Sequence, residues 1–340
     1  MKTNRIYLFI SIALLFASAC NKPEKEYMAP KVHIQNPFGI TNTKATMRAS
    51  FTEGSEDITV FGFEWKEITE DNWETISTQV NNGTYSFTIT NLKEKVEYAV
   101  RAFIIDASDN RVVSKEKRFL TNGTLTDIDG NTYYTLRYGS KTWMTENLRT
   151  TRYADGTPIE GRSGGVNLDS DGPVYFHGGY HTSYLREPNF GLLYNWAAAM
   201  RADDCETNIG TLPSFLKGAC PDGWHLPTIN EWAELIDHFG GSEEAGTIVK
   251  TNNWAEPAYL SFNSSRFSVE PAGWYYYEPG QGFRNLFSSA YFWSSTQNTL
   301  SGGFSAFAVA IVSENSGFYS IKMAKKTGYS VRCVRDHQDW

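Results

Sequence analysis

The stretch that decides the fold of this chain is Cys220-Pro-Asp-Gly-Trp-His-Leu-Pro-Thr-Ile-Asn-Glu-Trp-Ala-Glu-Leu-Ile-Asp-His-Phe239. Its first residues have the composition of a tight turn, because proline fixes φ and glycine tolerates a positive φ. Thr228 and Glu231 have the spacing of a capping box, in which each side chain accepts a hydrogen bond from an otherwise unpaired backbone N–H. Four apolar residues then fall on one helical face: Trp232, Leu235, Ile236 and Phe239. We therefore predict a turn followed by an amphipathic helix that ends at Gly240-Gly241.

Length and composition place the chain among folded globular proteins. Its 340 residues suffice for two domains with cores of their own, and 41% of them are hydrophobic against 20% charged. Eight of the ten tryptophans follow residue 122, which indicates two domains of different kinds. The net charge is −7, and it is −9 without the first nineteen residues, which contain Lys2 and Arg5 and no acidic residue. An acidic chain without a cluster of Lys and Arg argues against a nucleic-acid partner, because phosphate neutralisation needs such a cluster.

The N-terminus has the layout of a secretory signal. Lys2 and Arg5 precede an apolar run over residues 6–16, and small residues then lead to Cys20. This cleavage site resembles a bacterial lipobox, which implies a signal peptide over residues 1–19 and a lipid on Cys20 that anchors the protein to a membrane. The alternative is ordinary signal cleavage that leaves Cys20 as a spare thiol. Residues 20–30 form a charged tether that resembles the export signal of surface lipoproteins, so we expect an outer-membrane lipoprotein that faces outward, with a periplasm-facing orientation as the alternative.

Residues 31–121 have the pattern of an all-β domain. Seven short segments with many apolar-polar alternations are expected as strands at residues 32–34, 45–51, 60–66, 73–80, 85–90, 96–105 and 112–120. This number of strands in about ninety residues predicts a β-sandwich. The segment Leu92-Lys-Glu-Lys-Val-Glu-Tyr98 resembles the tyrosine-corner region of fibronectin type III domains, in which the tyrosine ties a crossover loop to the sandwich. The resemblance implies a spacer between the membrane and the next domain.

From residue 127 the sequence becomes aromatic and rich in glycine and turn residues. We expect two short strands around Gly139-Ser140, a helix over residues 190–201, and the helix that follows Thr228. Six further strands are expected at residues 267–269, 274–277, 291–294, 304–312, 318–323 and 329–334. Strands grouped around a few helices make this an α+β domain.

Eight short motifs occur in one order along this second half. They are Asp127-Ile-Asp-Gly-Asn-Thr-Tyr133, Trp143-Met-Thr-Glu-Asn-Leu148, Tyr153-Ala-Asp-Gly156, Leu193-Tyr-Asn-Trp196, Cys220-Pro-Asp-Gly-Trp-His-Leu-Pro-Thr228, Glu231-Trp232, Phe292-Trp-Ser-Ser-Thr296 and Ser330-Val-Arg-Cys-Val-Arg-Asp336. Together they resemble the Fibrobacter succinogenes major paralogous domain over residues 124–337. The resemblance implies a C-type-lectin-like fold with paired terminal strands, two helices and a long loop region.

Three thiols remain after Cys20 is lipidated: Cys205, Cys220 and Cys333. An oxidising compartment favours pairing, and the residues alone leave all three pairings open. Cys220 and Cys333 both lie in motifs of the family resemblance, so the resemblance favours a disulfide between them. The alternative pairing is Cys205 with Cys220.

No complete catalytic or metal-binding set is visible in the sequence. Residues 161–165 satisfy the G-x-S-x-G pattern, but they lack the following helix that a nucleophile elbow needs. Glu187-Pro-Asn189 is the tripeptide that binds calcium in C-type lectins, but here it leads into a predicted helix. His177 and His181 lack a third ligand in register. Cys333 stands alone near the C-terminus, where formylglycine-generating relatives of the lectin-like fold carry a cysteine pair. We therefore expect no catalytic residue, no metal and no cofactor.

Aromatic side chains are the remaining candidates for ligand binding. Trp274, Tyr275, Tyr276, Tyr277 and Trp293 could supply flat surfaces for sugar rings or protein contacts. Because adjacent residues of a strand point to opposite faces, about half of residues 274–277 should lie outside the core.

Three functions follow, in order of preference. The first is a lipid-anchored cell-envelope protein whose non-catalytic head binds a glycan or a protein at the cell surface. The second is an enzyme or accessory factor that acts on extracellular polysaccharide, and the third is a structural component of the envelope or of an appendage.

Overall fold

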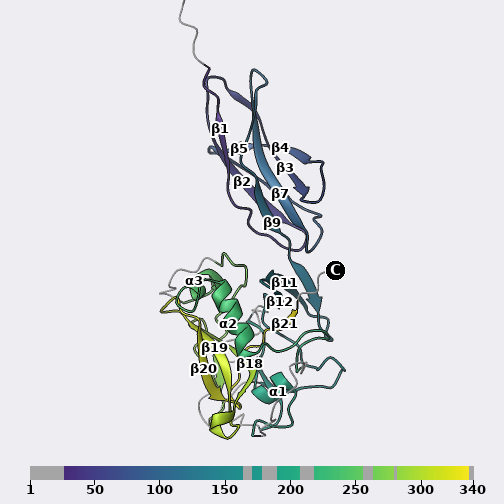
Figure 1. The fold of residues 1–340 in the computed structure, drawn as a ribbon, viewed down its shortest axis with the longest axis vertical. Helices are drawn as coiled ribbons and strands as arrows, with labels where there is room; N and C mark the ends of the chain where they lie inside the picture. Colours follow the sequence, from purple (N-terminus) through teal and green to yellow (C-terminus); the bar gives the residue numbers. More distant parts are fainter. Residues whose placement is uncertain are drawn as a thin grey trace, which may run out of the picture.

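The computed structural model describes residues 27–163, 171–177, 190–206, 218–255, 263–278 and 282–336. The predicted signal peptide, the lipidation site Cys20 and most of the tether lie outside these residues, as do His181 and Glu187-Pro-Asn189. A β-sandwich and a larger head domain are arranged end to end (Figure 1). None of the helices in the described part is both long and apolar enough to span a membrane.

The N-terminal domain is a sandwich of two antiparallel sheets. One sheet has the order β1-β2-β6-β5, and the other has the order β4-β3-β7-β8, with β9 also paired to β7. The strands are β1 (Lys31–Ile34), β2 (Ala45–Thr52), β3 (Ile58–Glu67), β4 (Glu74–Thr78), β5 (Val80–Asn81), β6 (Thr84–Ile89), β7 (Glu97–Asp106), β8 (Arg111–Val113) and β9 (Lys117–Leu120). Alternate residues of both sheets meet in one apolar core that includes Phe63, Tyr85 and Val100. The predicted β-sandwich is confirmed.

The expected strand over residues 112–120 is divided in two. Val113 lies opposite Phe103 and Lys117 lies opposite Val100, so this strand carries one residue more than β7 over the same interval. Ser114 occupies the irregular position: its N–H donates to Ala102 O, and its Oγ accepts from Ala102 N–H. A bulge of this kind separates β8 from β9.

Tyr98 makes the contact that its sequence context predicts. Its hydroxyl oxygen accepts a hydrogen bond of 3.0 Å from the backbone N–H of Lys93, at the start of the loop that leads into β7. The ring packs on Phe119 in β9 with centroids 5.5 Å apart. Tyr98 therefore ties the loop to both strands at the end of the sandwich nearest the head.

The head is built from several small sheets and short helices. Its sheets have the orders β10-β11-β12-β21, β13-β14-β15, β16-β17 and β18-β19-β20. The strands are β10 (Gly123–Thr126), β11 (Thr132–Tyr138), β12 (Lys141–Met144), β13 (Glu160–Ser163), β14 (Val174–His177), β15 (Leu193–Tyr194), β16 (Trp274–Tyr276), β17 (Gly282–Arg284), β18 (Ser289–Asn298), β19 (Ser305–Val312), β20 (Tyr319–Ala324) and β21 (Val334–Asp336). The helices are α1 (Trp196–Met200), α2 (Ile229–His238), α3 (Ala245–Val249) and the 3₁₀ turn η2 (Thr299–Ser301). The described chain is thus mostly β.

Helix α2 confirms the prediction from the opening stretch. Thr228 Oγ1 accepts from Glu231 N–H, and Glu231 Oε2 accepts from Thr228 N–H at 2.8 Å, which is the capping box. Trp232 and Leu235 are buried, and the Trp232 ring lies 4.8 Å from that of Trp143 in β12. The apolar face of α2 therefore packs against the strands of the head, where Figure 1 also places it.

Three other predictions for the head are corrected. The helix expected over residues 190–201 is only α1, because Leu193–Tyr194 pairs with β14 as β15 before the helix begins at Trp196. Residues 267–269 form no strand, and only Val269 makes an isolated bridge, to Lys250. Of the strand expected over residues 329–334, only Val334 belongs to a strand, β21.

Residues 328–334 link many parts of the head. Single bridges join Gly328 to Tyr275, Tyr329 to Tyr194, Ser330 to Phe292 and Val334 to His225. Each bridge goes to a different segment, so residues 328–333 form no regular ladder, and the ladder with β12 begins at Val334. This segment is the part of the chain on which β16, β15, β18 and the turn before α2 converge.

Candidate ligand-binding site

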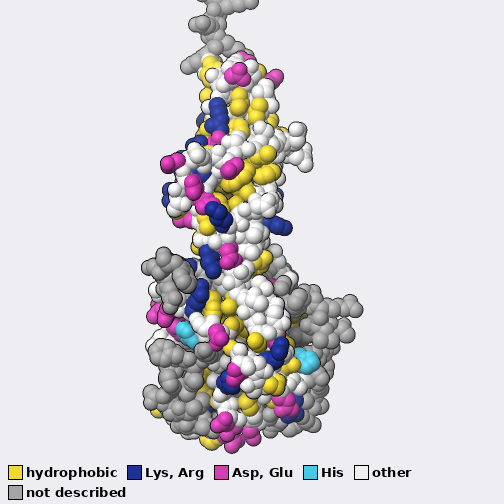
Figure 2. Space-filling model, turned by 90° about the vertical axis from the view of Figure 1, so that its right-hand side faces the viewer, with side chains coloured by type: hydrophobic (Ala, Val, Ile, Leu, Met, Phe, Trp, Pro, Cys, Tyr) yellow, Lys and Arg dark blue, Asp and Glu magenta, His cyan; other side chains and the backbone are white. Residues whose placement is uncertain are grey.

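A cleft of about 680 Å³ lies where the sandwich meets the head. Its volume is in the range of small-molecule and cofactor sites. The lining residues are Pro37, Phe38, Gly39 and Ile40 of the sandwich, Asn122 of the junction, and Tyr134, Thr145, Glu146, Thr251, Asn252, Asn263, Ser264, Arg266, Ser268 and Glu270 of the head. Both domains therefore contribute to one concave surface. Figure 2 shows the two domains stacked, with Lys and Arg side chains scattered over the visible face.

The sandwich supplies an aromatic wall. Phe38 lies between β1 and β2, where its N–H donates to Thr46 O at 3.0 Å and its carbonyl accepts from Thr46 N–H at 2.8 Å. The Phe38 ring is 42% exposed, and the guanidinium of Arg48 lies 5.1 Å from its centroid. The backbone of this wall is thus fixed by sheet pairing, while one side chain stays available to a ligand.

The facing wall comes from β11 and the residues after β12. Glu146 Oε2 accepts a hydrogen bond of 2.6 Å from Tyr134 N–H, and Thr145 Oγ1 donates to Tyr134 O. Arg149 lies 3.6 Å from the other Glu146 oxygen. Glu146 is therefore held in place by a backbone donor and by a neighbouring cation.

A strained loop forms the floor between these walls. Asn263, Arg266 and Ser268 all have φ between 41° and 62°, a region that residues other than glycine rarely occupy. Such backbone strain persists only where the surroundings hold it, and it is concentrated at functional sites. Arg266 Nη1 donates to Leu120 O at 2.7 Å, and its Nη2 donates to Asn122 Oδ1. The loop therefore joins the head to the last residues of the sandwich.

Arg332 supports this loop from inside the domain. Its side chain is fully buried, its Nη1 donates to Phe267 O, and its Nη2 donates to Ser268 O at 2.7 Å. Burial lowers the pKa of Arg332 to about 10, and the charges of Glu146 and Glu270 oppose this shift. A buried cation held by backbone carbonyls thus fixes the floor of the cleft, and the two cleft carboxylates compensate its charge.

Glu270 is the most deeply placed carboxylate of the cleft. It is only 7% exposed, and its Oε2 accepts hydrogen bonds of 2.8 Å from Thr251 Oγ1 and from Asn253 Nδ2. Both donors are uncharged. Glu270 therefore brings a negative charge to the cleft without a direct ion pair among the described residues.

The predicted aromatic residues divide into two groups. Tyr275 and Trp293 are completely buried, and Trp293 Nε1 donates to Tyr194 O at 2.8 Å. These two side chains offer no surface to a ligand, so their prediction as binding residues is corrected. Trp274, Tyr276 and Tyr277 are half-buried, as the alternation along a strand predicts. They do not line the cleft.

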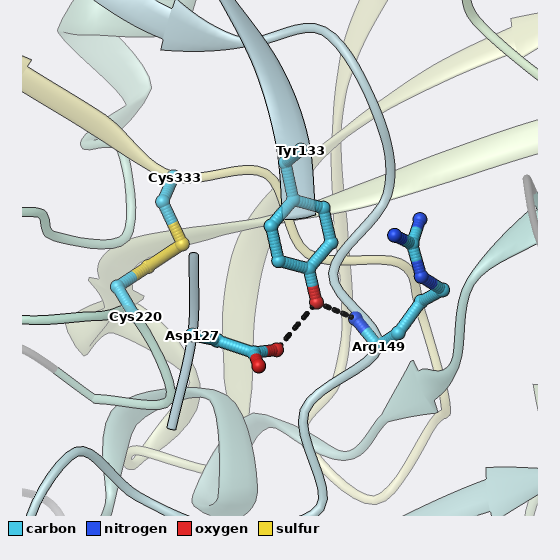
Figure 3. The surroundings of a disulfide bond; sticks show 5 residues. All are labelled: Asp127, Tyr133, Arg149, Cys220 and Cys333. Carbon is cyan, nitrogen blue, oxygen red and sulfur yellow. Dashed lines mark hydrogen bonds between the residues drawn. A yellow bond between two sulfur atoms is a disulfide. The ribbon is translucent and has the colours of Figure 1, made fainter. Parts of the chain in front are cut away.

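The predicted disulfide between Cys220 and Cys333 is present (Figure 3). Its Cα atoms are 5.8 Å apart, and it joins residues separated by 113 positions. Cys205 is a buried free thiol whose pKa is raised to about 12 by burial. The pairing of Cys205 with Cys220 is therefore excluded.

A buried tyrosine organises the acidic turn near the disulfide (Figure 3). Tyr133 OH donates to Asp127 Oδ2 at 2.6 Å and accepts from Arg149 N–H at 2.9 Å. Asp127 Oδ1 accepts from the backbone N–H groups of Asp129 and Asn131. These oxygens therefore close a turn, and no group of three His, Cys, Asp or Glu within the described ranges is placed to hold a metal ion.

Sequence reasoning missed the residues that build the cleft. Glu146 and Arg332 lie inside two of the quoted motifs, and this membership was the available signal. Arg266, Glu270 and Asn252 lie outside every motif, and nothing in their local sequence marks them. Phe38 lies within residues 31–121, whose sequence pattern indicates only a β-sandwich that serves as a spacer.

The fold and the cleft define a two-domain, mostly β protein with a polar cleft between a sandwich and a disulfide-closed head. The sequence pattern of the Fibrobacter succinogenes major domain matches residues 136–335, which is more than half of the chain. The chain therefore belongs to this family. No curated protein matches it.

Several solved structures are similar to a part of the chain. A structure described as a myokine is 22% identical, with 28% of this chain and 96% of that chain covered and a TM-score of 0.23. The sensor domain of the anti-sigma factor RsgI4 of Pseudobacteroides cellulosolvens is 19% identical, with 27% and 75% covered and a TM-score of 0.23. An FN3 domain of human collagen XX is 18% identical, with 28% and 91% covered and a TM-score of 0.22. Similarities of this size carry no argument about function.

Proposed function

We propose that this protein is a lipid-anchored cell-envelope protein that binds an extracellular ligand without catalysis, and that the cleft between its two domains is the binding site. The observation that carries the proposal is the cleft itself, which combines an exposed aromatic ring, amides, hydroxyls and carboxylates on a fixed backbone. Apolar surface with a few convergent polar groups is the usual composition of a ligand site. In this proposal the sandwich is part of the site and more than a spacer.

The anchor and the domain types complete the proposal. The Cys20 motif supports an outer-membrane lipoprotein that faces outward. The Lys93–Tyr98 hydrogen bond supports a fibronectin-III-like sandwich, and the pairing of β12 with β21 supports a lectin-like head. Mass spectrometry of the N-terminal peptide tests the anchor. An acylated Cys20 that is lost in Cys20→Ser supports it, whereas an unmodified Cys20 in the mature protein contradicts it.

The binding proposal is tested by blocking the cleft. Asn252 is exposed at its edge, so Asn252→Trp places a bulky ring in the cleft without disturbing the core. Ligands are first identified with a glycan array and with cross-linking of native envelope proteins to the mature chain. The blocked variant should bind at least tenfold more weakly than Asn230→Trp, a matched exposed position on α2. Equal binding by the two variants, or no ligand in either screen, would refute the proposal.

One observation favours a second candidate, the hydrolysis of extracellular polysaccharide. Glu146 and Glu270 line the same cleft, and most glycoside hydrolases use a pair of carboxylates. Release of reducing ends from polysaccharides by the wild-type chain, abolished in Glu146→Gln and in Glu270→Gln, would establish this activity in place of simple binding. Binding without release of reducing ends would establish the first candidate.

A further inference from the structure

From the charges and hydrogen bonds of the cleft we infer that its ligand is a neutral glycan, recognised through hydroxyl groups that donate to Glu270 and independently of calcium. This inference rests on the proposed function and narrows it to one chemical class.

The state of the single cleft arginine argues against an anionic ligand. The lining residues in the described part of the chain include Arg266 and neither lysine nor histidine. Arg266 already binds Leu120 O and Asn122 Oδ1, and its Nε atom is buried. Both of these partners are uncharged, so Arg266 keeps its positive charge. A carboxylate, sulfate or phosphate group would meet two carboxylates, Glu146 and Glu270, against this one cation of the described lining, which is unfavourable at short range.

The carboxylates suit a ligand rich in hydroxyl groups. Glu270 is more than nine-tenths buried and its known partners occupy Oε2, so Oε1 can accept further hydrogen bonds. Hydrogen bonds to an ionised acceptor are stronger than those between neutral groups. A sugar hydroxyl can donate to Glu270 without bringing a charge of its own into the cleft.

The other groups of the cleft fit the remaining surface of a sugar. The amide of Asn252 can both donate and accept, as sugar hydroxyls require. The partly exposed Phe38 ring adds apolar surface to the polar lining of the cleft, which suits the C–H face of a pyranose ring.

Calcium is not needed for this mode of recognition. Glu146 and Glu270 are the two carboxylates that line the cleft among the described residues, and Glu146 is committed to Tyr134 N–H and to Arg149. Calcium sites in proteins take six to eight oxygen ligands, usually with several carboxylates. The cleft therefore recognises hydroxyl groups directly.

The test is isothermal titration of the mature chain with neutral and anionic polysaccharides. Soluble mannan, xyloglucan and β-1,3-glucan serve as neutral probes, and polygalacturonate and heparin as anionic probes. At least one neutral probe should bind, with affinity unchanged by EDTA and changed less than threefold between 50 and 500 mM NaCl, because screening acts on charge pairs. Glu270→Gln should weaken binding at least tenfold, and Asn252→Ala at least threefold, whereas the exposed Glu53→Gln should have no effect.

The outcomes separate this inference from the proposed function. Binding of anionic probes only, or binding that EDTA abolishes, overturns the neutral-glycan inference. A protein ligand whose binding is lost in Asn252→Trp overturns it as well, but leaves the cleft as the binding site. A neutral glycan whose affinity is the same in wild type, Glu270→Gln and Asn252→Ala overturns both. Because the Asn252 side chain is exposed, Asn252→Ala stays informative even if Glu270→Gln does not fold.

Discussion

Arg332 Nε donates a hydrogen bond of 2.9 Å to Asn147 Oδ1, and this contact joins two family motifs that are 185 residues apart. Asn147 in turn donates to Phe190 O at 2.8 Å, so its side chain is satisfied on both sides. The guanidinium carbon of Arg332 also lies over two aromatic rings, 4.6 Å from the centroid of the Phe267 ring and 5.3 Å from that of the Phe292 ring. The motifs therefore meet beneath the cleft and hold the loop that forms its floor.

Replacement of this arginine should damage both stability and binding. Arg332→Lys keeps the charge but loses the planar fork that reaches two carbonyls and an amide at once. Disruption of a buried, hydrogen-bonded charge of this kind costs about 3 kcal/mol or more in the free energy of unfolding. Chemical denaturation should show this loss for Arg332→Lys and a change within about 0.5 kcal/mol for Arg335→Lys, which is more exposed and stacks on Trp224. Equal stability of the two variants would contradict the role given to Arg332.

The disulfide should contribute strongly to the stability of the head. A cross-link between residues 113 positions apart restricts the unfolded chain by about 4 to 5 kcal/mol in chain-entropy models. The double variant Cys220→Ser and Cys333→Ser should therefore unfold at much lower denaturant concentration, and Cys205→Ser should serve as the control. Peptide mapping under non-reducing conditions should find Cys220 joined to Cys333 and Cys205 alkylated only after unfolding. A free Cys220 or Cys333 in the oxidised protein would contradict the structure.

Glu231 should make the head sensitive to acid. Burial alone would raise the pKa of its carboxyl, but hydrogen bonds from His225, Thr228 and Lys141 outweigh burial and lower the pKa from 4.5 to about 2. Because the folded-state pKa lies below the unfolded value, this contribution is present above pH 4.5 and is lost as the pH falls toward 2. The shift corresponds to roughly 3 kcal/mol.

The measurement is the free energy of unfolding between pH 6 and pH 3. Glu231→Gln should be less stable than wild type at pH 6 and should lose less stability on acidification. Glu234→Gln, one turn away on the exposed face of α2, should follow the wild-type curve. Parallel curves for wild type and Glu231→Gln would exclude this carboxyl as a source of the acid sensitivity.

The orientation of the two domains should depend on Arg266. Arg266→Ala removes the hydrogen bonds to Leu120 and Asn122 that cross the junction. Small-angle scattering should then show a larger radius of gyration, and ligand affinity should fall at least tenfold because the two walls of the cleft are no longer held together. Arg118→Ala, an exposed position on β9, should leave both measurements unchanged. If scattering and affinity are the same for Arg266→Ala and wild type, the junction is held by other contacts.

Local signals explain which parts of the fold were predictable. The capping box of Thr228 with Glu231 and the apolar spacing of α2 are contained within twelve residues, so the sequence predicts the helix directly. Most sandwich strands were predicted within two residues of their ends, because alternation and turn residues are also local. The helix expected over 190–201 was wrong because pairing of Leu193–Tyr194 with β14 overrides the local helical spacing.

The candidate site was much less predictable. Tyr275 and Trp293 were chosen for their chemistry, but the structure buries both, since sequence alone does not say which face of a strand is covered. The fold of the head brings Glu146, Asn252 and Glu270 together, and the domain junction adds the segment around Phe38.

The sequence by itself determined the family of the head, the division into a β-rich first domain and an aromatic second one, and helix α2, because each depends on ordered motifs or on short-range periodicity. Only the tertiary structure decided that residues 328–334 bridge several segments, that Arg332 lies buried beneath the loop at residues 263–268, and that Phe38 faces the head. These features depend on contacts between residues that lie between about forty and almost two hundred positions apart. The physical reason is that packing and charge compensation act through space, whereas sequence patterns report only on neighbours along the chain.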